Sequence, residues 1–504
     1  MSLTIYNTLS RTKEPFQTLT PNQVKMYCCG VTVYDYCHLG HARSYIVWDT
    51  VRRYLQWRGY AVEYIQNFTD IDDKILKRAD IEQSSMTAVA EKYTDAYFED
   101  LHRLNVRDAD SYPLATKHIQ EIQDLIADLE TKGFAYAVDG DVYFRVRKDD
   151  DYGKLSKRNL DDLRAGAGER VEAADPDQIK KEDPFDFALW KAAKPGEPSW
   201  ESPWGNGRPG WHIECSAMIQ KQLGETIDIH CGGGDLVFPH HENEIAQSEC
   251  AHDRPLSTYW MHNGMVKLSG EKMSKSLGNF ITIRKLLDDY RDGNDQQIDP
   301  MTVRLFVLTA QYRKPMDFSD ASITAAGQSW QTIKDGLIFS DKFGKKLGWD
   351  NLDPISSELP ASTATEVERF NTAVDDDFNF AEGLVVVFEL AKELRKVGNI
   401  ITHDSEQNVD PILLRDKWQT LEKLAGVFGL EVNPNELGST AINQNISKAL
   451  DTLSDAEIEA LLTERQIARA NKDFATSDRI RAKLTEDKIV VIDKAGVSST
   501  WYRS

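Results

Sequence analysis

Two short runs of this sequence combine residue types that could hold the phosphates of a nucleotide. The first is HLGH at residues 38–41, which opens a stretch with helical periodicity. A helix N-terminus presents unpaired N–H groups and the positive end of a dipole, so it suits phosphate, and Gly40 would let a nucleotide approach the backbone. His38 and His41 could donate hydrogen bonds to phosphate oxygens, although two histidines in such a turn are more often surface or capping residues.

The second run is KMSKS at residues 272–276, followed by Leu-Gly-Asn. Lys272 and Lys275, interleaved with serines in a loop, could clamp a triphosphate and stabilise the charge that builds on pyrophosphate. The alternative is an exposed basic loop with no ligand. The phosphate-binding pattern G-x-x-x-x-G-K-[ST] does not occur in the chain, so an ATP-using enzyme would need another cradle. The two runs together could supply one.

A third set of residues has the character of metal ligands. His240 and Glu244, in FPHHENE at 238–244, are four apart and would share one face of a helix, with Pro239 well placed at its start. His, Glu and one or two Cys make a zinc ligand set. The alternatives are a polar helix face and cysteines that act as small buried hydrophobes. Ile245 stands where H-E-x-x-H would need its second His, which argues against a zinc hydrolase.

The elements that would position these residues form a β-α-β unit. Apolar residues predict a strand at 23–31, a helix at 38–57 and a second strand at 61–68, and further strands are expected at 227–230 and 258–261. The glycines at 232–234 follow the predicted end of one strand. The stretch 183–218, rich in Pro, Gly and Trp, is expected to be a structured loop that returns the chain to the sheet. The predicted fold class is α/β: a Rossmann-type parallel sheet with an insertion, then a helical bundle and a small C-terminal α+β domain.

Composition limits the remaining possibilities. The 504 residues carry 60 Lys and Arg against 81 Asp and Glu, a net charge of −21, which argues against non-specific coating of nucleic acid. The segment 461–504 is the exception, because basic residues outnumber acidic ones there; on charge alone it would be a solvated helical surface. The six cysteines form no disulfide pattern, and no apolar signal core or membrane span of about eighteen residues is evident. We expect a cytoplasmic protein with reduced thiols and no membrane partner.

The two phosphate-type runs occur in the order, and at a plausible separation, of the HIGH and KMSKS motifs. The sequence therefore resembles the class I aminoacyl-tRNA synthetases, with Leu39 in place of the usual Ile. Three further runs resemble those of the cysteinyl-tRNA synthetases: CGVTVYD at 29–35, WHIECS at 211–216 and FPHHENE at 238–244. The resemblance extends over nearly the whole chain.

This resemblance implies roles for individual residues. It implies one zinc ion held by Cys29, Cys215, His240 and Glu244, with Cys28 as an alternative to Cys29 because the two form a doublet. It implies that Thr69, Trp211 and His230 surround the cysteine substrate, although Trp211 could serve packing alone. Gly232 and Gly233 would approach the adenosine, or could be structural. His38, Gly40 and His41 would bind ATP, with His38, His41, Lys272 and Lys275 in the catalytic set.

The implied reaction needs a means of telling cysteine from serine. A pocket alone discriminates poorly between such near-isosteres, whereas zinc binds a thiolate well, and serine's hydroxyl is far less acidic. The implied zinc would hold the substrate and would not activate water. ATP with Mg²⁺ would be the second cofactor, and the expected steps are cysteinyl-adenylate formation and transfer of the cysteinyl group to tRNA(Cys). Catalysis would rest on positioning and charge stabilisation, without a protein nucleophile.

The resemblance also implies a domain plan for a chain that acts as a monomer. The predicted segments are the first half of the catalytic Rossmann domain at 1–113, a connective insertion at 114–200, the second half with the zinc site at 201–262, the KMSKS loop and stem-contact region at 263–320, a helical bundle at 321–430, a linker at 431–454 and an anticodon-binding domain at 455–504. Two alternatives remain. A ligase that passes cysteine to an aminosugar would share the core but lack the last segment. A non-catalytic RNA-binding paralogue would not need both ATP motifs and a complete ligand set.

Overall fold

The computed structural model describes most of the chain. The described residues are 2–160, 180–268, 270–272, 280–293, 295–352, 358–403 and 409–433, with short stretches between 461 and 503; only the backbone is described for Lys272, His403 and the strands after residue 488. The chain divides into two compact units, the first formed by 1–333, 357–390 and 419–431, and the second by 334–356, 391–418 and 432–504.

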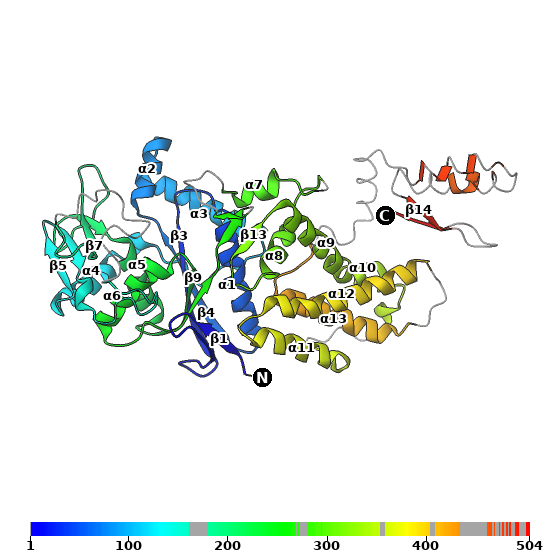
Figure 1. Ribbon diagram of the computed structural model, residues 1–504, viewed down its shortest axis with the longest axis horizontal. Coiled ribbons are helices and arrows are strands. Elements are labelled where there is room, and N and C mark those ends of the chain that lie inside the picture. The colour runs from blue at the N-terminus through cyan, green and yellow to red at the C-terminus, as the bar shows by residue number, and fades with distance from the viewer. Residues whose placement is uncertain are drawn as a thin grey trace. The chain divides into compact units, whose positions relative to one another are not determined.

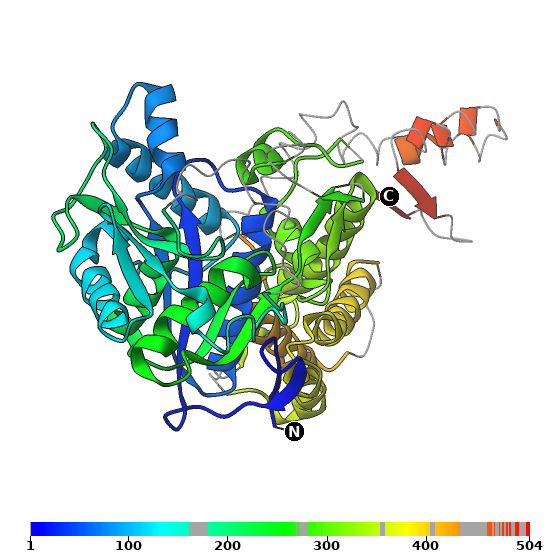
Figure 2. The same ribbon diagram turned by 60° about the vertical axis from the view of Figure 1, so that its left-hand side comes forward.

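A four-stranded parallel sheet lies at the centre of the first unit. Its order is β10 (Ser257–Asn263), β9 (Ile227–Gly233), β3 (Gln23–Thr32) and β4 (Ala61–Thr69). The strands are mostly buried, as expected of a parallel sheet covered on both faces. Helix α1 (Leu39–Trp57) lies on one face and α5 (Trp211–Leu223) on the other (Figures 1 and 2). The predicted β-α-β unit is therefore present, within a residue of its expected bounds.

The order of the strands creates the place where a ligand binds in such sheets. From β3 the chain crosses through α1 to β4 on one side, whereas β9 lies on the other side of β3. Because all four strands are parallel, their carboxyl ends share one edge, and a crevice opens between neighbours whose connections leave in opposite directions. That edge carries Cys29, Thr69, Gly233 and Asn263.

Two sequence predictions about this region were wrong. Strand β9 continues through the glycines: Gly232 pairs with His262 and Gly233 with Asn263 of β10. A Cβ on Gly232 would lie 2.8 Å from Cε1 of His241, so this glycine permits close packing inside a strand.

The stretch 183–218, predicted as a loop, contains β7 (Phe187–Ala192), β8 (Gly207–Pro209) and the first half of α5. Residues 213–219 of helix α5 are all buried, so tertiary packing outweighs the modest helix propensity of its Trp, His, Ile and Cys residues.

The insertion is an antiparallel sheet with its own core. Strands β5 (Ala135–Val138), β6 (Asp141–Phe144), β7 and β8 are neighbours in that order, and helix α4 (Ile119–Thr131) packs on them. Asp139 and Gly140 have φ of 49° and 83°, the left-handed pair that a two-residue hairpin turn needs. The core of the insertion includes Ile122, Ile126, Leu129, Val142, Phe144 and Trp190 together with residues of α5 and α6 (Glu242–His252).

The remaining elements precede the sheet or follow it. The hairpin β1 (Thr4–Asn7) and β2 (Thr12–Pro15) begins the chain, and α2 (Asp73–Glu82) and α3 (Met86–Arg103) follow β4. After β10 come β11 (Val266–Leu268), β12 (Glu271–Lys272), α7 (Ile283–Asp288), α8 (Pro300–Leu308) and β13 (Met316–Phe318), with β11 between β12 and β13. The helical part contains α9 (Asp320–Leu337), α10 (Phe339–Phe343), α11 (Ala364–Asp375), α12 (Phe380–His403) and α13 (Pro411–Val427). Short 3₁₀ turns occupy Ala115–Lys117, Val146–Lys148, Trp349–Asn351 and Ala361–Thr363, and the chain ends with the antiparallel pair β14 (Ile489–Ile492) and β15 (Thr500–Arg503). Among the described residues, no helix is both long and apolar enough to cross a membrane.

Candidate metal centre and nucleotide pocket

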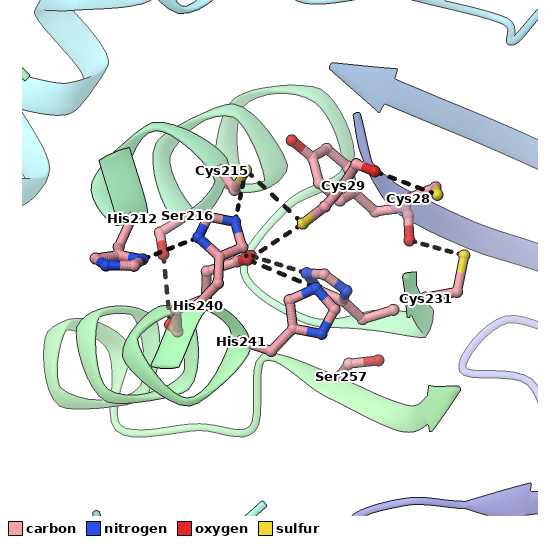
Figure 3. Close-up of polar contacts among 12 residues, drawn as sticks. Cys28, Cys29, His212, Cys215, Ser216, Cys231, His240, His241 and Ser257 are labelled. Atoms are coloured by element: carbon pink, nitrogen blue, oxygen red, sulfur yellow. Dashed lines mark hydrogen bonds and ion pairs between the residues drawn. The ribbon is translucent and has the colours of Figure 1, made fainter. Parts of the chain in front are cut away.

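Four buried side chains from three separate segments meet beside the carboxyl edge of the sheet. They are Cys29, Cys215, His240 and Glu244, and their ligand atoms all lie within 4.8 Å of one another. Figure 3 labels the first three of them. Sγ of Cys29 is 3.8 Å from Sγ of Cys215 and 3.2 Å from Oε1 of Glu244. Nε2 of His240 is 3.6 Å from Sγ of Cys215 and 3.0 Å from Oε1 of Glu244. These are the four residues that the resemblance implies as zinc ligands.

Their spacing suits one tetrahedral ion. Two thiolates each about 2.3 Å from such an ion would be about 3.8 Å apart, and a thiolate and an imidazole nitrogen about 3.6 Å apart. The Cys29–Cys215 and Cys215–His240 distances match these values, while the two distances to Glu244 are slightly shorter. Two Cys, one His and one carboxylate also form the donor set that zinc prefers. The residues present therefore fit a zinc ion.

A bulge in β3 places Cys29. Strand β3 pairs with β4 up to Cys28 and resumes only at Val31, so Cys29 and Gly30 lie outside the regular ladder. The Gly30 N–H donates to Oδ1 of Asn67 at 2.9 Å, and a Cβ on Gly30 would collide with the Asn67 carbonyl oxygen. Only glycine therefore allows this bulge. Cys28 remains inside the ladder, paired in register with Cys231 of β9, so it is not in the ligand cluster.

Helices place the other three ligands. Cys215 lies in the second turn of α5. His240 belongs to a wide turn, Val237–His241, that runs directly into α6, and Glu244 lies in the first turn of that helix. Phe238 has non-helical dihedral angles, so the helical course begins at Pro239, as the sequence predicted. The i, i+4 spacing then brings the side chains of His240 and Glu244 to the same face.

The charges of the cluster favour a cation. Burial alone would raise the pKa of Glu244, but His230 and His240 lower it well below its usual range. Burial would likewise lower the pKa of His240, yet Glu244 and Cys215 raise it to about 10. The hydrogen bond from Cys29 lowers the pKa of Cys215 to about 6. A buried thiolate and carboxylate thus draw a proton onto His240, and a metal ion would replace that proton.

Outer side chains orient the ligands. Nδ1 of His212 lies 2.9 Å from Nδ1 of His240, and the ring of Trp211 stacks on that of His240 at 4.3 Å. Nε2 of His230 lies 2.8 Å from Oε2 of Glu244, leaving Oε1 toward the cluster. Such contacts fix the orientation of metal ligands. Cys29, His230, His241 and Glu244 also come within reach of one another, so His230 and His241 are immediate neighbours of the site.

The predicted substrate residues lie around this cluster. Thr69 is buried at the end of β4, and its hydroxyl donates to Oε2 of Glu214 at 3.0 Å, next to Cys215 in sequence. His230 is fully buried and stacks on Trp260 at 4.3 Å. Trp211 is 37% exposed, and its ring stacks on the buried ring of His240. The sequence interpretation gave no role to His212 or His241. His212 follows Trp211 directly and His241 follows His240 directly, so the two doublets could have pointed to both histidines.

A cavity of about 170 Å³ is lined both by Cys29 of the cluster and by residues of the HLGH run. Its lining includes Cys29, Gly30, His38, Gly40, His41, Ser44, Tyr45, Gly233, Asp235, Leu236, Asn263, Gly264, Met265 and Val266. Cys29 therefore belongs both to the ligand cluster and to the wall of the cavity. Gly233 also lines the cavity, whereas Gly232 packs against His241.

The two histidines of the HLGH run cap α1 and stack on each other. Nδ1 of His38 accepts the Gly40 N–H at 3.1 Å, and Nδ1 of His41 accepts the His38 N–H at 3.2 Å, with ring centroids 3.8 Å apart. An imidazole that accepts at Nδ1 carries its proton at Nε2 when neutral. The capping interpretation is therefore correct, and each neutral ring carries its N–H at Nε2.

Within the lysine run, the structure describes only the backbone of Lys272. Lys272 ends β12, opposite Lys267 of β11; its side chain, and the whole of Lys275, lie outside the described residues. The segment that follows returns to the helix that carries the histidines. The Leu39 N–H donates to the Ile281 carbonyl at 3.0 Å, and the Ile283 N–H donates to the Cys37 carbonyl at 2.9 Å.

Comparison with known proteins identifies the family. A model described as "tRNA synthetases class I (C) catalytic domain" matches residues 15–328, a DALR domain matches 369–433, and a "Cysteinyl-tRNA ligase anticodon binding domain" matches 452–499. The cysteine--tRNA ligases of Rippkaea orientalis and Gloeothece citriformis are 57% and 58% identical to this chain over 504 residues, covering 100% of both chains in each case. The chain belongs to the cysteine--tRNA ligase family. The family resemblance seen in the sequence is thus confirmed.

Solved structures of other class I synthetases share the fold of this cysteine--tRNA ligase family member. The Mycobacterium tuberculosis methionyl-tRNA synthetase in complex with methionyl-adenylate has a TM-score of 0.54 at 16% identity, over 81% of this chain and 90% of that one. The LeuRS of an Agrobacterium radiobacter ternary complex has a TM-score of 0.56 at 11% identity, over 82% and 85%. The predicted fold class is confirmed: a parallel-sheet catalytic domain with an antiparallel insertion, then a helical DALR domain and a C-terminal domain.

Proposed function

We propose that this chain activates L-cysteine with ATP and transfers the cysteinyl group to tRNA(Cys). The observation that carries the proposal is the double position of Cys29, in the metal-type cluster and in the wall of the cavity that His38, Gly40 and His41 also line. A substrate thiol at the cluster and a nucleotide at the start of α1 would therefore be adjacent. Family membership supports the same reaction.

Cys29, Cys215, His240 and Glu244 would hold one zinc ion, whose chemistry when bound is to prefer a thiolate over a hydroxyl. The four side chains are buried, so water competes poorly at the cluster. Thr69, Trp211 and His230 would orient the rest of the amino acid. Trp211 offers an exposed aromatic face beside His240, and His230 keeps Glu244 aligned.

In the first step, a carboxylate oxygen of cysteine bonds to the α-phosphorus of ATP, and the bond to the bridging oxygen of pyrophosphate breaks. The Nε2–H groups of His38 and His41 would donate to phosphate oxygens at the N-terminus of α1. Lys272 and Lys275 would neutralise the charge that moves onto pyrophosphate, with Mg²⁺ accompanying the nucleotide. Gly40 and Gly233 both line the cavity, where ATP would approach the backbone.

In the second step, a terminal ribose hydroxyl of tRNA attacks the carbonyl carbon of the adenylate, and AMP leaves. The match of residues 452–499 to an anticodon-binding domain supports tRNA as the acceptor. An enzyme that passes cysteine to an aminosugar would have no use for that segment.

The proposal is tested with ATP–pyrophosphate exchange and with charging of total tRNA, each using cysteine and serine in parallel. We expect exchange and charging with cysteine only. Exchange without charging of tRNA, together with transfer to an aminosugar, would favour the aminosugar ligase. Charging with serine, or no exchange with cysteine, would contradict the proposal.

A further inference from the structure

Arg43 is a buried cation with no acidic partner among the described residues. It lies in the first turns of α1, two positions after His41, and its side chain is 1% exposed. Its guanidinium donates to three backbone carbonyls: Met265 at 2.7 Å, Tyr312 at 3.1 Å, and Lys314. Its Nε has no hydrogen-bond partner in the part of the chain that the structure describes.

Such a group is expensive to bury. Burial lowers the pKa of Arg43 to about 10, so the side chain is still charged at neutral pH. A charge removed from water without a counter-ion destabilises a fold unless its hydrogen bonds or its position bring a gain elsewhere. Only arginine offers several donors in a rigid fork that can serve three carbonyls together.

The three carbonyls belong to the junction that carries the lysine run. Met265 directly precedes β11, which pairs with β12, and β12 ends at Lys272. The Gly264 N–H donates to the Tyr312 carbonyl at 2.8 Å, and the Met316 N–H donates to the Met265 carbonyl at 3.0 Å. Arg43 therefore joins α1 to the two segments, 264–265 and 312–314, that form the base of this small sheet.

The same junction forms a wall of the cavity. Gly264, Met265 and Val266 line it on one side, and His38, Gly40 and His41 line it at the start of α1. The junction is braced from its other side by Asp377, whose carboxylate accepts from the Tyr312 hydroxyl at 2.9 Å and from Nη2 of Arg313 at 2.7 Å. Arg43 donates hydrogen bonds from the helix of the two histidines to this turn, and Trp48 of the same helix packs edge-on against Tyr312.

We propose that Arg43 is a positioning residue for the reaction with ATP, and that it sets the distance between the histidines of α1 and the wall that leads into the lysine run. This inference rests on the proposed function. Arg43 lies outside the described lining of the cavity; it acts through the placement of His38, His41 and strand β11. A shift of about 1 Å in such groups can lower a rate by roughly 10²-fold.

The test compares Arg43→Lys with Arg52→Lys in the full-length protein loaded with zinc. Arg52 lies on the same helix, is also buried, and donates to the Asp108 carbonyl and to Asp110, away from the cavity. Lysine keeps the charge in both variants but cannot reach several acceptors at once. The measurements are kcat and KM for ATP and for cysteine in pyrophosphate exchange, with metal content and the melting temperature.

For Arg43→Lys we expect kcat to fall by roughly 10–100-fold, with normal zinc content and a KM for cysteine within about threefold of the parent value. Arg52→Lys should melt at a lower temperature and keep its kcat. A kcat for Arg43→Lys equal to that of Arg52→Lys would overturn the inference, as would a loss of zinc and cysteine binding in parallel with kcat.

If Arg43→Lys does not fold, Gly264→Ala examines the same junction, because a Cβ there would collide with the Lys314 carbonyl. The Gly264→Ala variant should then show the lower kcat with normal zinc content and a nearly unchanged KM for cysteine. A folded Gly264→Ala protein with normal kcat overturns the inference. If the unmodified protein shows no cysteine-dependent exchange, the proposed function fails first.

Discussion

The sulfur atoms of Cys29 and Cys215 lie 3.8 Å apart although 186 positions separate the two residues in the chain. The gap is far longer than a disulfide bond of about 2.05 Å, yet it equals the expected spacing of two thiolates on one tetrahedral zinc ion. Both residues are buried, one in a strand bulge and one in a helix, so the fold holds the two thiols at a metal-sized separation.

The neighbouring cysteines of the doublet should behave differently. Cys29→Ala removes a side chain of the cluster, so purified protein should contain little zinc and should not bind cysteine. Cys28 lies inside the ladder beside Cys231, so Cys28→Ala should keep both and lose about 1 kcal/mol of stability from the small space left behind. Metal analysis and calorimetric titration with cysteine distinguish the two. Zinc retained by Cys29→Ala and lost by Cys28→Ala would move the ligand to Cys28.

The bulge should depend on Gly30. A methyl group there would collide with the Asn67 carbonyl, so Gly30→Ala should displace Cys29, reduce zinc content and lower the free energy of unfolding by about 1–3 kcal/mol. Gly426→Ala is the matched control, because a Cβ there meets nothing within 4 Å in helix α13, and it should raise stability by up to about 1 kcal/mol. Denaturant unfolding and metal analysis give both results. A Gly30→Ala protein as stable and as zinc-rich as the parent would show that the bulge does not need glycine.

Loss of one lysine of the KMSKS run should slow activation without affecting the metal. Lys275→Ala should lower the rate of adenylate formation by roughly 10²–10³-fold, the effect of losing one donor to a developing charge. Lys267→Ala removes an exposed charge from the neighbouring strand β11 and should leave the rate near normal. Cysteine-dependent pyrophosphate exchange measures both rates. Near-normal exchange in Lys275→Ala would remove this lysine from the proposed catalytic set.

The sequence alone predicted the parts of the fold that have a clear period. The two strands and the helix around HLGH lie within a residue of their predicted bounds. Local patterns failed where tertiary contacts decide: residues 213–219 of α5 are all buried, and β9 continues through Gly232, where the absence of a side chain leaves room for the ring of His241.

The same limit applies to the candidate site. The i, i+4 spacing of His240 and Glu244 predicted a shared face, but no local pattern joins them to Cys29 and Cys215; only the family resemblance did. The hydrogen bonds from Arg43 to the carbonyls of residues 265, 312 and 314 could not be predicted from the sequence, because every residue type has the same backbone carbonyl.

The most direct test of the central claim is the absorption spectrum of the protein with cobalt(II) in place of zinc. Thiolate ligands give a charge-transfer band, and Cys29 and Cys215 should provide it in the protein alone. We predict that cysteine increases this band, as a third thiolate joins the metal, and that serine leaves it unchanged at the same concentration. A spectrum that saturating cysteine does not alter would contradict the proposal that the metal selects the substrate by its sulfur atom.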